Sequence, residues 1–250
     1  MSITIKTPEE IRLMRRAGQI VAAALALLKS NIKPGMTTAE LDAIAHNYAV
    51  KHGVVPSFKG YNGFPASLCV SMNEEIVHGI PSPKRKVRAG DIVSLDFGAI
   101  YDGFHGDAAI TVGVGKIGDV ARRLLAVTEE SLAIGIANAR AGGHLSDISW
   151  AIQSYVESYG FSVVRQYVGH GIGSKMHEEP QVPNFGPPGR GPRLQPGMTL
   201  ALEPMVNVGT FRTAVKGDGW TVVTEDGSLS AHFEHTIVIT DDEADILTRP

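Results

Sequence analysis

Two aspartates in the middle of the chain stand where the neighbouring residues are apolar. Asp96 lies inside the run Ile92–Phe97, and Asp102-Gly103 is typical of a two-residue hairpin turn. With that turn, Asp107 pairs opposite Gly98, so the two aspartates become diagonal neighbours on one face of a hairpin. Two carboxylates on an apolar face repel each other and are costly to bury unless cations join them. Taken alone, the pair slightly favours the simpler interpretation, in which that face is exposed and both side chains are solvated.

The second half of the chain adds two carboxylates and a histidine in comparable surroundings. Glu203 follows the apolar run Thr199–Leu202, and Glu234 precedes the apolar run Ile237–Ile239. His170 is flanked by glycines, which let a backbone approach closely and leave the imidazole accessible. Four carboxylates and one histidine form a ligand set for two divalent cations that share bridging carboxylates. The set is too rich in oxygen for a structural zinc site, which prefers thiolates and more imidazoles.

The other histidines are ambiguous when each is judged by itself. His78 and His177 lie in segments where a histidine is more often a loop residue than a catalytic one. The two that flank Glu234, His232 and His235, either support that residue or have no role. The remaining histidines are assigned to the surface or to loops: His46, His52, His105 and His144.

Composition limits the classes of protein that can hold such a site. The 250 residues carry a net charge of −3, with 43% hydrophobic and 20% charged residues. These values are ordinary for a folded soluble protein and exclude a disordered chain. The near-neutral balance also excludes a dedicated nucleic-acid-binding protein, so no specific nucleic acid is expected as a partner. Cys69 is the single cysteine, so no disulfide can form within the chain.

The first apolar run is predicted to be a helix rather than a targeting signal. Thr7-Pro8-Glu9-Glu10 is a capping box with proline at the first helical position, and apolar residues then recur at helical spacing. The run from Ile20 to Leu28 is far too short to span a membrane, and the polar Lys29-Ser30-Asn31 follows it instead of a cleavage site. We therefore expect a cytoplasmic protein that does not bind membranes.

The rest of the chain alternates helical and strand-like patterns. A second capping box, Thr37-Thr38-Ala39-Glu40, opens a helix that Gly53 closes. The predicted elements after the first helix are helices at 38–52, 119–139 and 145–159, strands at 68–71, 91–99, 104–114, 161–168, 199–206, 220–224 and 229–240, and a proline- and glycine-rich surface loop at 184–197.

A weak internal repeat relates the two halves of the chain, about residues 1–115 and 116–250. A shift of 107 residues places Gly35 on Gly142 and Asp96 on Glu203. Common residues at helix ends and in strands can also match by coincidence. If the repeat is real, two helix-plus-hairpin halves form a single domain around a pseudo-two-fold axis. Asp96 then faces Glu203 across that axis.

Taken in order, these residues resemble the type I methionine aminopeptidases. The resemblance rests on Asp96 and Asp107 with ten residues between them, Gly169-His170-Gly171-Ile172-Gly173, Glu203-Pro204 and Phe233-Glu234-His235-Thr236. Pro34–Thr38, Met72–Glu74 and Val77–Pro81 match further signatures, and the resemblance covers essentially the whole chain. It implies a mixed α/β (α+β) fold, the duplicated "pita-bread" fold. Two pseudo-symmetric halves, each of helices and an antiparallel hairpin, would surround a central two-metal site.

The resemblance implies a ligand role for each residue of the acidic set. Asp96 and Glu203 would each bind mainly one metal, Asp107 and Glu234 would bridge both, and His170 would ligate one. The implied cofactors are two divalent cations per chain. Cobalt, manganese, iron and zinc are all compatible with such a ligand set.

The catalytic roles also follow from the resemblance. The metals would lower the pKa of a shared water, and Glu203 would pass a proton from that water to the leaving amine. His177 would donate to the scissile carbonyl oxygen as negative charge develops there, and His78 would contact the peptide nitrogen.

The pocket for a methionine side chain is transferred in the same way. Its walls would be apolar and aromatic with one thiol, which suits a flexible thioether. Core packing is the alternative explanation for each of these side chains. Phe58 and Met176 depart from the residues expected in some bacterial members, which affects the shape of the pocket rather than the reaction. The positions are Phe58, Tyr61, Phe64, Cys69, Met176 and Trp220, together with His78 and His177.

The resemblance implies an enzyme that removes the initiator methionine from nascent polypeptides whose second residue is small. Its partners would be nascent-chain N-termini and, transiently, the ribosome, contacted through the surface of this domain by a monomer. One alternative is a metallopeptidase like prolidase or aminopeptidase P, which is disfavoured because no N-terminal domain precedes Thr7-Pro8. The other is a non-catalytic peptide-binding protein on the same fold, which the complete set of five ligands disfavours.

Overall fold

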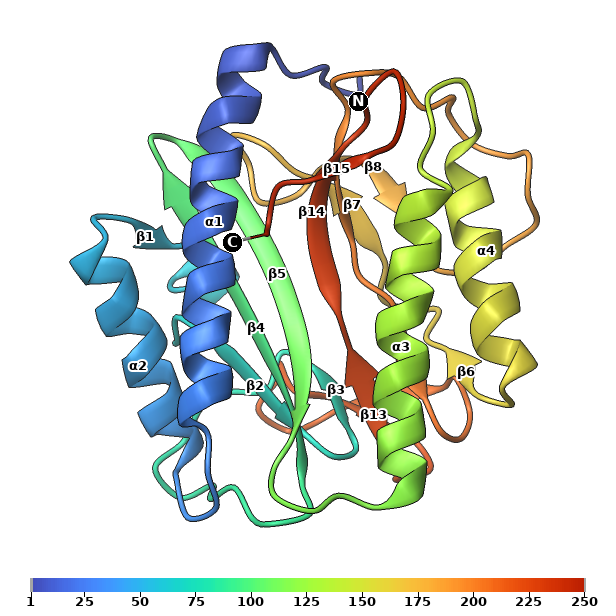
Figure 1. Cartoon of the computed structure of the whole chain (residues 1–250). Coiled ribbons are helices and arrows are strands. Elements are labelled where there is room, and N and C mark those ends of the chain that lie inside the picture. The colour runs from blue at the N-terminus through green and yellow to red at the C-terminus, as the bar shows by residue number, and fades with distance from the viewer. Residues whose placement is uncertain (1, 250) are drawn as a thin grey trace.

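The computed structural model describes residues 2–249, which form a layer of four helices on one face of an antiparallel sheet (Figure 1). In Figure 1, α1 and α3 lie over the middle of the sheet, and α2 and α4 lie outside them on opposite sides. The helices are α1 Pro8–Asn31, α2 Thr38–Lys51, α3 Asp119–Ala137 and α4 Leu145–Ser158. Each lies within a few residues of its predicted bounds.

Local hydrogen bonds explain why α1 and α2 begin where they do. The Thr7 side chain accepts the backbone N–H of Glu10, and the Glu10 carboxylate accepts the N–H of Thr7. Thr37 and Glu40 repeat this capping box at the start of α2. Both predicted boxes are confirmed, because each needs only residues within one turn of helix.

The main sheet has nine strands, in the order β1-β4-β5-β14-β9-β7-β8, with β2 added on β4 and β15 on β14. Its strands are β1 Val55–Pro56, β2 Cys69–Met72, β4 Ile92–Tyr101, β5 Phe104–Gly113, β7 Gly169–Gly171, β8 Glu178–Val182, β9 Thr199–Leu202, β14 Glu234–Val238 and β15 Asp245–Ile246. Two smaller sheets have the orders β13-β10-β6 and β11-β12-β3. Their strands are β3 Glu75–Val77, β6 Ser162–Val163, β10 Met205–Asn207, β11 Thr213–Val215, β12 Val222–Thr224 and β13 Ser230–His232.

Several predicted strands are wrong in extent, for identifiable reasons. The predicted strand at 199–206 is interrupted at Glu203-Pro204, because proline has no N–H to donate to a ladder. The predicted strand at 229–240 is interrupted at Phe233, where the chain passes from a small sheet into the main one. The strand predicted at 161–168 is reduced to β6. The strands β1, β3, β7, β8, β11 and β15 were not predicted, because they are short and depend on distant partners.

The predicted internal repeat recurs in the backbone. Thr37 forms an isolated bridge with Lys86, and His144 forms the equivalent bridge with Arg193. The helices that follow these bridges, α2 and α4, begin and end at positions related by the same 107-residue shift. The second hairpin differs from the first: β9 and β14 pair directly, but the strands β10 to β13 are inserted between them.

Two apolar cores lie between the helices and the main sheet, one in each half. The first includes Leu28 of α1, Leu41 of α2 and Phe97 of β4. The second includes Leu124 of α3, Ile148 of α4 and Leu200 of β9. This burial stabilises the sheet as a rigid support, and the side chains on its other face are left to build a site.

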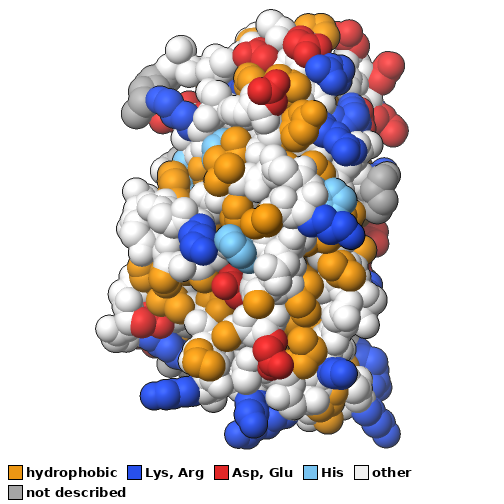
Figure 2. Space-filling model, turned by 90° about the vertical axis from the view of Figure 1, so that its left-hand side faces the viewer, with side chains coloured by type: hydrophobic (Ala, Val, Ile, Leu, Met, Phe, Trp, Pro, Cys, Tyr) orange, Lys and Arg blue, Asp and Glu red, His pale blue; other side chains and the backbone are white. Residues whose placement is uncertain are grey.

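The surface carries charges of both signs. Figure 2 shows acidic and basic side chains spread over one face, with exposed apolar and histidine side chains between them and several basic side chains at the lower edge. This mixture agrees with the small net charge of the sequence. Among the described residues, no helix is long and apolar enough to cross a membrane.

Candidate metal centre

Strand register brings the carboxylates of both halves onto one face of the main sheet. Asp107 pairs opposite Gly98, which confirms the predicted register of the β4–β5 hairpin. Asp96 pairs with Ala109, and Ala109 pairs in turn with Glu234 on β14. Because side chains directly across neighbouring strands point to the same face, Asp96 and Glu234 lie in one row.

The interruptions in the second half place the remaining two side chains. Leu202, the last residue of β9, pairs with His235, so Glu203 leaves the sheet at the end where Glu234 enters it. The side-chain amide of the buried Asn184 donates to the backbone carbonyl of Glu203, with 3.0 Å between nitrogen and oxygen. His170 pairs with Ala201 on the other side of β9.

These side chains converge closely enough to hold a metal ion. Asp107, His170 and Glu234 are buried, and each offers a ligand atom within 4.8 Å of the other two. The Nε2 atom of His170 lies 3.5 Å from Oε1 of Glu203. Asp96 lines the same hollow as these four residues.

Electrostatics explain why this cluster needs positive charge. Burial raises the pKa of Asp107 to about 7. Burial also raises the pKa values of Asp96, Glu203 and Glu234 well above their usual range, and repulsion from neighbouring carboxylates raises them further. The pKa of His170 falls to about 3, chiefly because of burial, so its imidazole is neutral and able to act as a ligand.

Unpaired oxygen atoms mark where cations fit. Asp96 Oδ1, Asp107 Oδ1 and Glu234 Oε1 are buried and accept no hydrogen bond from any residue between 2 and 249. Buried polar atoms almost always have a hydrogen-bond or metal partner, so three such oxygens without one indicate a site for a bound ion. Carboxylate oxygens with one imidazole suit the divalent cations predicted from the sequence, and the residues present therefore fit such ions.

Two further histidines border the carboxylates. His177 is held from both sides: its Nδ1 lies 2.7 Å from the Tyr61 hydroxyl, and its ring lies 4.2 Å from that of His170, centre to centre. His78 adopts a left-handed backbone conformation with φ of 61°, and its ring meets Trp220 edge-on at 6.2 Å. Burial lowers the pKa of His78 to about 4, so that imidazole is neutral.

The rest of the hollow is apolar. It has a volume of about 190 Å³, smaller than the cavities that take drug-sized ligands. Beyond the acidic end, its lining includes Phe58, Phe64, Cys69, Met176 and Trp220, which pack against one another. The structure thus brings every residue of the predicted site into one hollow, and it adds Asn62.

One histidine lies elsewhere than expected, and a second lies beside Glu234, as one of its two predicted alternatives had it. His105, predicted at the surface or in a loop, is buried in β5 and bonded to the Ser57 hydroxyl at 2.9 Å. His232 is buried with its Nε2 3.9 Å from Glu234 and 4.0 Å from Glu203. Neither ring nitrogen of His232 has a hydrogen-bond partner among the described residues. Its position two residues before Glu234 is the only sequence signal for this placement, and Asn62 has none.

Comparisons with known proteins agree with this geometry. Residues 12–241 match metallopeptidase family M24. Methionine aminopeptidase 1 of Bacillus subtilis is 58% identical over 247 residues, which cover 99% of both chains.

Solved structures extend the comparison to the fold. The crystal structure of methionine aminopeptidase from Thermotoga maritima is 50% identical, covers both chains fully and superposes with a TM-score of 0.98. The prolidase from Pyrococcus furiosus, at 22% identity, has a TM-score of 0.81 over 98% of this chain and 65% of its own. That likeness shows a shared pita-bread fold alone. The chain therefore belongs to metallopeptidase family M24 and, within it, to the methionine aminopeptidases.

Proposed function

We propose that this chain removes the N-terminal methionine from polypeptides by hydrolysing their first peptide bond. The observation that carries the proposal is the single hollow in which buried carboxylates meet an apolar wall. Such a hollow takes one side chain and the adjoining amino terminus, which limits cleavage to the first residue. The chain is 58% identical to a methionine aminopeptidase over nearly its full length and only 22% identical to a prolidase. This difference supports N-terminal methionine as the substrate rather than a prolidase substrate.

We propose that the site takes two divalent cations. Asp107 and Glu234 would be shared between them, Asp96 and Glu203 would each serve mainly one, and His170 would supply the nitrogen ligand. Such cations, when bound, act as Lewis acids that make water a nucleophile at neutral pH. Manganese, cobalt, iron and zinc all accept this ligand set, and availability decides between them.

Three protein side chains would transfer protons or contact the scissile peptide bond. Glu203, which directly follows β9, accepts a proton from the attacking water on its carboxylate and passes it to the leaving amine. His177 donates a hydrogen bond to the scissile carbonyl oxygen, and the Tyr61 hydroxyl at its Nδ1 leaves Nε2 to make that contact. His78 contacts the nitrogen of the scissile bond.

The apolar wall would select the first side chain of the substrate. A thioether chain would find apolar and aromatic contacts with Phe58, Phe64, Cys69, Met176 and Trp220, and Tyr61 also lines the hollow. A small second residue is required, because a bulky one would collide with the walls beside the carboxylates.

We also propose the cellular setting. The enzyme would act in the cytoplasm as a single domain and as a monomer, on nascent chains that it meets during transient contact with the ribosome. Mass measurement in solution and cosedimentation with ribosomes test these two statements separately.

The proposed activity is tested by methionine release from Met-Ala-Ser and Met-Leu-Ser, using chelated protein to which manganese or cobalt is added back. The expected result is metal-dependent cleavage of the alanine peptide only. Cleavage of neither peptide, with metal demonstrably bound, would favour a prolidase-like enzyme or a non-catalytic peptide-binding protein. Failure to bind any metal would refute the ligand set itself.

A further inference from the structure

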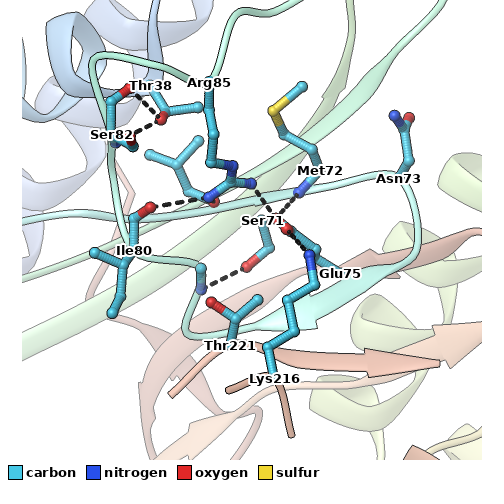
Figure 3. A network of polar contacts seen from close by, with 12 residues as sticks. Thr38, Ser71, Met72, Asn73, Glu75, Ile80, Ser82, Arg85, Lys216 and Thr221 are labelled. Carbon is cyan, nitrogen blue, oxygen red and sulfur yellow. Dashed lines mark hydrogen bonds and ion pairs between the residues drawn. The ribbon is translucent and has the colours of Figure 1, made fainter. Parts of the chain in front are cut away.

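A buried carboxylate outside the metal centre is paired with two cations at once. Glu75, in β3, is only 4% exposed, and its Oε1 lies 2.6 Å from Lys216 Nζ. Its Oε2 bonds the guanidinium of Arg85 and accepts the backbone N–H of Met72 at 2.9 Å (Figure 3). Removing either Arg85 or Lys216 would leave the buried Glu75 carboxylate with only one positive partner, which is energetically costly. Both ion pairs therefore help to fix the chain segments that they join.

Arg85 connects this carboxylate to the segment that carries His78. Its Nη1 donates to the carbonyl oxygen of Ile80 at 2.9 Å, two residues after His78 (Figure 3). The segment is under constraint, since a left-handed conformation such as that of His78 is costly outside glycine. Gly79 approaches Val70 so closely that a Cβ atom would lie 2.1 Å from its carbonyl oxygen. Such a conformation persists only where surrounding contacts impose it.

Lys216 connects the same carboxylate to the segment that carries Trp220. Its backbone N–H donates to the carbonyl of Thr221 at 2.8 Å, which closes the turn between β11 and β12. Within that turn, Asp218 accepts the N–H groups of Trp220 and Thr221. These bonds connect the backbone that carries Trp220 to that of Lys216.

The two segments meet again inside the substrate hollow. The rings of His78 and Trp220 are in edge-on contact there, and Trp220 also packs edge-on against Phe64 with 5.1 Å between ring centres. Glu75 does not line this hollow. It lines a separate one of about 280 Å³, together with Ile80, Arg85 and Lys216. The Glu75 carboxylate therefore does not touch the wall itself, and Arg85 and Lys216 connect it to the two segments that do.

We propose that Glu75 is a positioning residue for the methionine pocket. By pairing with Arg85 and Lys216, it holds the His78 and Trp220 segments against each other and sets the width of the apolar wall. The inference rests on the proposed function for the identity of the ligand, but the arrangement of the wall can be measured without turnover.

The test uses Trp220 as its own reporter. The chain has two tryptophans, and Trp150 is 49% exposed on α4, so Trp150→Phe leaves Trp220 as the single emitter. In that background, Glu75→Gln should increase quenching of Trp220 by acrylamide. The KM for Met-Ala-Ser should rise about tenfold, with manganese affinity and helix content unchanged. Lys216→Met should reproduce the change in quenching, and Arg85→Met should lower kcat more than it raises KM.

Two controls separate positioning from general stability. Asp245→Asn removes a carboxylate from a surface ion pair with Arg15, and Ile152→Ala lowers stability in the core between α3 and α4. Both should leave KM and Trp220 quenching unchanged. The proposal is overturned if Glu75→Gln changes neither quantity, or if Ile152→Ala changes both equally.

Other outcomes remain interpretable. If Glu75→Gln does not fold, Lys216→Met decides the question, because the Lys216 side chain is 42% exposed and its loss is tolerable. A Trp220 environment unchanged in that variant would refute the proposal. Absence of peptide cleavage in the parent protein would refute the proposed function and leave the fluorescence result standing.

Discussion

Asp107 and Thr236 exchange two hydrogen bonds across the junction of the two halves. The Thr236 hydroxyl donates to the carbonyl oxygen of Asp107 at 2.8 Å and accepts the Asp107 N–H at 3.0 Å. One residue belongs to β5 and the other to β14, two positions after Glu234. A single threonine therefore fixes the spacing of two carboxylates that come from different halves of the chain.

Replacing this hydroxyl should loosen the metal centre. Thr236→Val keeps the volume but leaves both backbone groups of Asp107 unpaired, which should lower the free energy of unfolding by about 3 kcal/mol. Manganese affinity, measured by calorimetry, should fall by about tenfold or more. Thr236→Ser retains the hydroxyl and is the matched control, with affinity close to that of the parent. Equal affinity in the valine and serine variants would contradict this account.

Neutralising one carboxylate should affect stability and metal binding in opposite directions. Glu234→Gln removes a buried ionisable group whose pKa is raised well above its usual range, first by burial and then by repulsion from Asp107, Glu203 and Asp96. Because ionised Glu234 is stabilised only in the unfolded chain, the metal-free variant should be more stable by about 1 kcal/mol at pH 7. The same change should weaken manganese binding more than a hundredfold (an order-of-magnitude estimate) and abolish turnover.

Thermal unfolding in chelator and calorimetry with manganese measure these two effects. Glu225→Gln, at an exposed carboxylate, is the control and should change neither. If the metal-free Glu234→Gln variant is less stable than the parent, the buried carboxylates do not destabilise the metal-free protein.

Loss of the His177 imidazole should impair turnover without removing metal. His177→Ala should lower kcat for Met-Ala-Ser by about 10²–10³-fold, because a donor to the developing oxyanion is lost. Manganese affinity should stay within about twofold of the parent, since the carboxylate set is intact.

Tyr61→Phe should give a smaller loss, because it removes only the hydroxyl bonded to His177 Nδ1. Steady-state kinetics at saturating manganese compare the three proteins. A large fall in metal affinity in His177→Ala would reassign this residue as a ligand.

Burial of neutral His78 should make stability depend on pH. Its pKa is about 4 in the folded protein against 6.5 for an unperturbed histidine. The unfolded chain therefore binds a proton that the folded chain does not, so this contribution is complete above pH 6.5 and is lost as the pH falls towards 4. The loss is at most about 3 kcal/mol.

His78→Asn tests this contribution, because asparagine tolerates the left-handed backbone at this position. Urea unfolding in chelator from pH 7 to 4 should show a shallower decline for the variant. Other titrating neighbours, including His177 and His232, contribute to both proteins, so their effects largely cancel in the difference. Parallel curves would mean that His78 does not titrate in this range.

The sequence by itself determined the features that depend on residues close together in the chain. The capping boxes at Thr7 and Thr37 act within one turn of helix, and the Asp102-Gly103 turn sets the register of β4 on β5. That register placed Asp96 and Asp107 on one face before any tertiary contact was known. The order of the acidic residues, with His170 among them, was also sufficient to indicate the family.

Only the tertiary structure decided how these segments meet. The interruption at Phe233, the burial of His105 and His232, and the pairing of Glu75 with Lys216 all depend on residues far apart in the chain. No local pattern encodes such contacts, because each partner is chosen by the packing of whole sheets. The carboxylates of the two halves face one metal centre because β5 pairs with β14, and Thr236 holds that junction closed.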